Sequence, residues 1–196
     1  MDFEKSIAEL AEYIQGRQFD AVINRIDGMK AHSVSWSVQP SKEFLPFKIM
    51  LSGLRPAPLV KEPVNKTNAF EYNFNEQGKL FLINSYGQKG SIEWKEYIDL
   101  ESNISVSVDK YYDFLYCSKL IVDDSDDSDD LIASIYIDDE VKVYYSYVYE
   151  GGVINSINVR SSQNGYIETT LFVERNGLEL VNIYYFFNEK KVYLIN

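Results

Sequence analysis

The 196-residue chain has few of the side chains that most often carry catalysis, metal binding or covalent cross-links. Its one cysteine cannot form an internal disulfide, and its one histidine cannot build a multi-histidine zinc site. That histidine, His32, stands at the end of an expected helix, where a capping or surface role suits it better than a catalytic triad. No glycine-rich phosphate loop opens a helix. These absences predict a protein that is not an enzyme and holds no cofactor and no metal.

Long apolar runs are also missing. None approaches the ~20 residues of a membrane span, and residues 1–5 lack the basic and apolar regions of an export signal. Cys117 lies in the apolar stretch 114–117 and is expected to be a buried small hydrophobe. Together these features predict a cytoplasmic protein with no membrane partner.

Basic residues are scarce, because 19 Lys and Arg stand against 30 Asp and Glu and leave a net charge of −11. Residues 93–150 hold sixteen acidic residues and four lysines, a net charge of −12, so this segment carries the whole excess. Such a field repels nucleic acid and attracts basic protein surfaces. Solubility alone is the other explanation of acidity.

Residues 1–32 show two apolar patterns with helical spacing, each followed by a glycine, and predict an amphipathic helical hairpin. From Val34 the apolar period changes to two, which predicts strands at 34–38 and 47–51. Residues 53–66 contain three prolines and predict an extended surface connection. Any boundary inside the otherwise single domain 1–196 would fall there.

The rest of the chain, 69–196, alternates short apolar-periodic runs with Gly- and Asn-containing turns. The predicted strands are 69–75, 79–85, 91–98, 103–108, 112–122, 131–138, 141–149, 153–160, 166–174, 178–187 and 191–195. Connections this short cannot hold crossover helices, so the strands must form an antiparallel meander. The predicted fold is α+β, with a helical hairpin before a large, mostly antiparallel sheet. A curved and a barrel-like form of this sheet both fit the pattern.

The run DDSDDSDD places six carboxylates in eight positions: Asp123, Asp124, Asp126, Asp127, Asp129 and Asp130. An EF-hand loop needs Gly at position 6 and Glu at position 12, and neither possible register supplies them. A different cation site, a solvated hairpin loop and an attraction site for a basic partner stay open. Strand direction places this run on one edge of the sheet and residues 138–140 on the other.

Tyrosine is abundant, with sixteen copies. Tyr145, Tyr147 and Tyr149 fall on one face of the predicted strand 141–149, which ends at Glu150. A half-buried sheet face explains this pattern, since aromatic residues favour strands. A rigid contact surface for a basic protein explains it as well.

Small size, focused acidity, the run 123–130, Tyr-rich strands and absent catalytic motifs together resemble bacterial immunity proteins that neutralise polymorphic or contact-dependent toxins. The resemblance implies a non-enzymatic inhibitor that covers the active or substrate surface of a basic, nuclease-type toxin domain. The expected partner-binding residues are Asp123, Asp124, Asp126, Asp127, Asp129, Asp130, Tyr145, Tyr147, Tyr149 and Glu150. The alternatives are a β-sheet protein that binds a small molecule or cation, and a carboxylate-dependent hydrolase.

Overall fold

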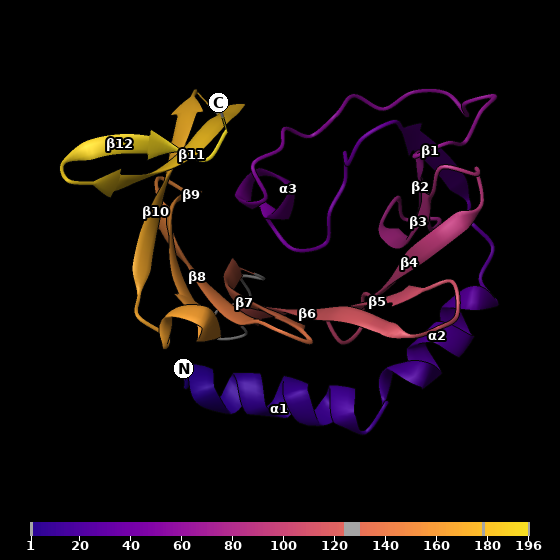
Figure 1. The fold of residues 1–196 in the computed structure, drawn as a ribbon, viewed down its shortest axis with the longest axis horizontal. Coiled ribbons are helices and arrows are strands. Elements are labelled where there is room, and N and C mark those ends of the chain that lie inside the picture. The colour runs from indigo at the N-terminus through magenta and orange to yellow at the C-terminus, as the bar shows by residue number, and fades with distance from the viewer. Residues whose placement is uncertain (1, 124–129, 178, 196) are drawn as a thin grey trace.

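A single curved antiparallel sheet dominates the computed structural model, which describes residues 2–123, 130–177 and 179–195 (Figure 1). Its twelve strands lie side by side in chain order: β1 (Ser33–Ser37), β2 (Phe70–Phe74), β3 (Leu80–Tyr86), β4 (Ile92–Asp99), β5 (Ile104–Asp109), β6 (Phe114–Asp123), β7 (Asp130–Asp138), β8 (Lys142–Glu150), β9 (Val153–Ser161), β10 (Thr169–Asn176), β11 (Glu179–Phe187) and β12 (Lys190–Tyr193). The predicted meander is therefore confirmed. Within the described part of the chain β1 and β12 do not pair, so the sheet is curved and open, not a barrel.

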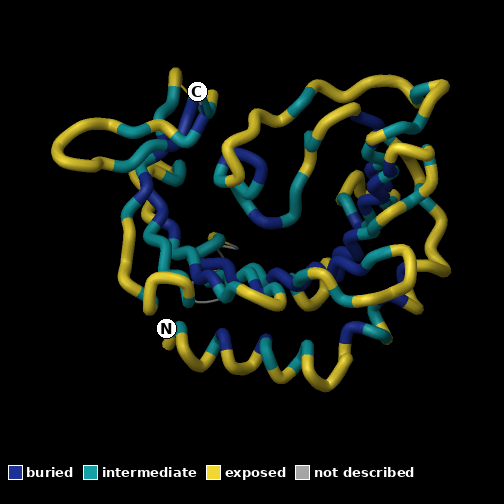
Figure 2. The backbone as a smooth tube through the Cα atoms, viewed as in Figure 1, coloured by how far each residue is buried: buried dark blue, intermediate teal, exposed yellow. Residues whose placement is uncertain are grey.

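Two helices, α1 (Phe3–Gln15) and α2 (Phe19–Asp27), lie against the outer, convex face of the sheet (Figure 1). Asp2 caps α1 by accepting hydrogen bonds from the backbone N–H groups of Glu4 and Lys5. The two predicted helices are present, but they form no compact hairpin, because α2 continues beyond the end of α1 and does not fold back along it (Figure 1). The sheet-facing side of α1 is buried and its other side exposed (Figure 2). No helix of the described ranges is long and apolar enough to cross a membrane.

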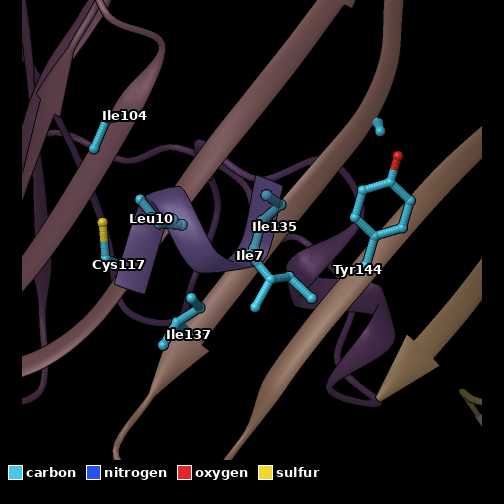
Figure 3. Close-up of a cluster of buried hydrophobic side chains, with 8 residues drawn as sticks. Ile7, Leu10, Ile104, Cys117, Ile135, Ile137 and Tyr144 are labelled. Carbon is cyan, nitrogen blue, oxygen red and sulfur yellow. The ribbon is translucent and has the colours of Figure 1, made fainter. Parts of the chain in front are cut away.

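The outer face of the sheet carries an apolar layer under α1. Ile7 and Leu10 of α1 pack against Cys117, Ile135 and other apolar side chains of β5 to β8 (Figure 3). Cys117 has no exposed surface, and this burial raises the pKa of its thiol to about 12. The prediction of a buried cysteine is confirmed.

The inner, concave face is covered by the connection between β1 and β2, which carries the short helix α3 (Lys48–Leu51) (Figure 1). The predicted strand at 47–51 is wrong. Phe47 adopts a left-handed conformation with φ 65°, and the Glu43 carboxylate accepts a hydrogen bond from the Ile49 N–H at 2.5 Å. This side-chain cap favours a helical turn over an extended strand, which a short apolar run alone cannot distinguish. One further short helix, η1 (Ser162–Asn164), joins β9 to β10.

Candidate functional site

Three carboxylates lie at strand ends on one edge of the sheet. Asp123 at the end of β6 stands directly opposite Asp130 at the start of β7, and Glu150 ends β8 on the same edge. We call Asp123, Asp130 and Glu150 the acidic edge. The other predicted residues of the run, Asp124, Asp126, Asp127 and Asp129, lie outside the described residues.

Tyr149 belongs to this edge as well. Its side chain is 39% exposed, and its hydroxyl donates a hydrogen bond to the Leu131 carbonyl at 2.9 Å. Burial of part of the ring and the nearby Asp130 carboxylate both raise the pKa of the phenol. Gly151 and Gly152 turn the chain with φ of 59° and 80°, and Glu150 pairs with Val153 across this tight hairpin. Glu150 is exposed. A fixed, exposed aromatic ring therefore stands beside the carboxylates.

Tyr145 and Tyr147 share one face of β8 as predicted, but that face is the inner one. Tyr147 is only 7% exposed, its hydroxyl lies 2.6 Å from the Ser134 hydroxyl, and its ring packs against Phe47 with centroids 6.4 Å apart. Tyr145 is half-buried in the same layer. The structure thus places Tyr149 at the acidic edge and Tyr147 in the interior.

A second acidic cluster occupies the β7–β8 turn at the opposite edge. Asp138 accepts hydrogen bonds from the backbone N–H groups of Glu140 and Val141 at 2.9 and 2.7 Å, and so shapes the turn. Asp139 and Glu140 are exposed. Since neighbouring antiparallel turns alternate between edges, the two acidic clusters form separate patches, as the strand directions predict.

The inner face holds a feature that no sequence motif indicates, a pocket of about 250 Å³ between α3 and strands β2 to β6. We call it the inner pocket. The side chains that give it chemical character are Glu43, Lys48, Phe70, Trp94, Glu96 and Tyr116. They come from the β1–β2 connection, β2, β4 and β6, so the curvature of the sheet is what brings them together.

Glu96 forms the charged floor of the inner pocket and is only 4% exposed. One carboxylate oxygen accepts a hydrogen bond from the Ser105 hydroxyl and the other from the Tyr116 hydroxyl, each at 2.9 Å. Burial and the adjoining Glu96 charge raise the pKa of Tyr116 well above its ordinary value, so the phenol stays protonated and donates. The two hydroxyls hold this buried carboxylate in place.

Lys48 enters the pocket from α3. Its ammonium lies over the Tyr116 ring, 3.4 Å from the centroid, and 5.4 Å from the Tyr136 centroid. The Nζ atom is buried and has no hydrogen-bond partner among the described residues. Burial lowers the pKa of Lys48, although Glu96 and Glu43 act in the opposite direction.

Glu43 is the second carboxylate of the pocket. Burial raises its pKa to about 7, and the hydrogen bonds from the backbone N–H groups of Ile49 and Phe47 only partly offset this rise. The same hydrogen bonds hold the start of α3. Glu43 therefore links the position of Lys48 to the ionisation of a buried carboxyl group.

Sequence reasoning missed these residues because they are distant in the chain and ordinary one by one. One signal was present. With a period of two, Glu96 falls on the same strand face as Trp94 and Ile98, and a carboxylate among apolar positions indicates a buried polar site. Lys48 gives no such signal, because the period of two in its run predicts a strand.

The described residues include no group of three or more His, Cys, Asp or Glu side chains that could hold a metal ion. Neither family models nor curated proteins match this chain.

Proposed function

We propose that the chain is a non-enzymatic inhibitor, an immunity protein of the bacterial cytoplasm that neutralises a basic, nuclease-type toxin by covering its active or substrate surface. The observation that carries the proposal is the acidic edge, where Asp123 and Asp130 oppose each other across the end of two paired strands. Like charges directly opposite each other destabilise a sheet. A basic partner surface would gain from the carboxylates gathered on this edge.

The surroundings of the acidic edge suit a protein contact. Tyr149 and Val148 are 39% and 44% exposed and lie next to Glu150. Aromatic residues beside charges are typical anchors in protein interfaces, where the ring supplies buried area and the charges set orientation and association rate. Glu150 and Asp130 form no ion pair with any residue in the described ranges, so both carboxylates are available to a partner.

The test begins with recovery of the partner by tagged protein from its native cells, followed by its purification. The wild-type chain should block the nuclease activity of that partner at equimolar ratio. The double variant Asp130→Asn/Glu150→Gln should associate about tenfold more slowly at low salt, with a weaker dependence of the association rate on salt. Stopped-flow measurement of the association rate decides this.

The matched control is Asp139→Asn/Glu140→Gln, which removes the same charge from the opposite edge. With both double variants compared at ~0.1 M salt, it should leave the association rate within about twofold of the wild-type value, because a screening length of ~10 Å keeps the effect of each patch local. Equal effects of both double variants on the association rate would show that only the net charge matters, and would contradict a specific role of the acidic edge. A recovered partner whose activity continues in the complex would contradict inhibition.

A further inference from the structure

The inner pocket contains a buried cation that lacks an acceptor. The Lys48 ammonium carries three N–H donors, yet Nζ is buried without a hydrogen-bond partner among the described residues. Its neighbours are the Tyr116 and Tyr136 rings, whose centroids lie 3.4 and 5.4 Å from Nζ and which offer no oxygen acceptor to the ammonium through their faces. A buried ammonium without an acceptor is unfavourable in a medium of low polarity. A ligand that brings an oxygen acceptor to Lys48 would remove this cost.

The charge around Lys48 limits what that ligand can be. Glu96, Glu43 and a second lysine, Lys42, also line the pocket, so two acidic and two basic side chains surround it. Both carboxyl groups act on the pKa of Lys48. An anion that approached Lys48 would meet the two carboxyl groups, and a cation that approached the carboxyl groups would meet Lys48. The pocket therefore favours a ligand without net charge that offers an acceptor and a donor side by side.

The walls set the shape of the ligand. Phe70 and Trp94 stand edge to face with ring centroids 6.1 Å apart, and Tyr116 adds a third ring. Aromatic walls favour a flat aromatic ligand. The volume of about 250 Å³ is smaller than the ~300–1,000 Å³ of pockets for drug-sized molecules, so the ligand is small.

We propose that the inner pocket binds a small, neutral aromatic amide. Its carbonyl oxygen accepts a hydrogen bond from Lys48, its amide N–H donates to Glu96, and its ring lies against Phe70 and Trp94. The inner pocket opens on the concave face, whereas the acidic edge lies at the strand ends, so this site does not depend on the proposed inhibition of a toxin.

Isothermal titration calorimetry with three probes that share one ring tests the proposal on the full chain. Benzamide is neutral, benzoate is an anion and benzylamine is a cation. Benzamide should bind in a saturable 1:1 manner, and the two charged probes should bind at least tenfold more weakly. The absence of benzamide binding, or tighter binding of either charged probe, would overturn the proposal.

Two variants connect the binding to named side chains. Lys48→Met keeps the length of the side chain but removes the donor, and should weaken benzamide binding at least tenfold. The control Lys61→Met changes an exposed lysine of the same connection and should leave binding unchanged. Glu96→Gln removes the negative floor, so the preference for benzamide over benzoate should fall at least tenfold. A thermal unfolding scan verifies that each variant is folded, and unaltered benzamide binding by Lys48→Met would refute the site.

Discussion

The two faces of the sheet are built by opposite chemistry. On the outer face, apolar side chains of the helices pack against apolar side chains of the sheet: Leu10 of α1 and Ile135 of β7 are 1% and 0% exposed. On the inner face, the sheet buries Glu96 and a series of hydroxyl groups under α3. The fully buried serines of strands β5 to β7 are Ser105, Ser107, Ser118 and Ser134. The apolar contacts of α1 with the outer face gain free energy from burial, whereas each buried polar group of the inner face needs a partner to be tolerated.

The contacts of α1 on the outer face therefore stabilise the fold through apolar burial, whereas the buried polar groups of the inner face act through their hydrogen bonds and charges. Removal of apolar groups from the outer face should be costly. Replacement of an inner charged group should have effects that depend on its hydrogen bonds and on pH. Three measurements of the free energy of unfolding test this difference between the two faces.

The largest effect is expected for Leu10→Ala on α1. Leu10 is almost completely buried against the sheet, so the change leaves a cavity and should lower the free energy of unfolding by about 2–5 kcal/mol. Urea denaturation measures it. The control Leu54→Ala alters a side chain that is 49% exposed in the inner connection and should cost under about 1 kcal/mol. Equal costs would show that the outer layer is not the stabilising one.

The next effect concerns Glu43 and depends on pH. Its ordinary pKa is 4.5 and burial raises the folded-state pKa to about 7. The folded state therefore holds the proton more tightly. Its contribution to stability is fully present below pH 4.5 and is lost as pH rises through 7, a loss of up to about 3 kcal/mol.

Glu43→Gln should remove this part of the pH dependence, because glutamine does not titrate while its side-chain oxygen still accepts from the Ile49 N–H. Urea denaturation at a series of pH values from ~4 to ~8 measures how the free energy of unfolding changes with pH. The control Glu76→Gln changes an exposed carboxylate in the β2–β3 turn and should follow the wild-type curve. If the free energy of unfolding of Glu43→Gln depended on pH as that of the wild type does, Glu43 would not contribute to the pH dependence of stability.

The sequence predicted the strands well because alternation and turn residues are local signals. Gly151 and Gly152 mark the β8–β9 hairpin, and the apolar alternation on either side sets its strands. The same local rule failed at Lys48, where a period-two run became α3 because Glu43 caps it from outside the run. The outcome there depended on a side-chain contact that a periodicity does not contain.

The candidate sites show the same division. The acidic edge could be located from strand direction and charge, although the burial of Tyr147 could not, since alternation groups residues by face but does not say which face is covered. The inner pocket combines Lys48 with Glu96, two residues that only the curvature of the sheet and the path of the connection bring together. Long-range contacts of this kind follow from tertiary packing and leave little trace in one sequence.

The smallest effect compares the two faces at neighbouring positions of one strand, β8. Tyr147 faces inward and its hydroxyl lies 2.6 Å from the buried Ser134 hydroxyl, whereas Tyr144 faces outward, where its ring packs against Phe3 and no hydrogen bond joins its hydroxyl to another described residue. Tyr147→Phe should lower the free energy of unfolding by about 1 kcal/mol, because Ser134 is left without its partner. Tyr144→Phe, the matched control, should change it by under about 0.5 kcal/mol. Urea denaturation of both variants measures the difference, and a larger loss for Tyr144→Phe would reverse the assignment of the inner face as the one held by polar contacts.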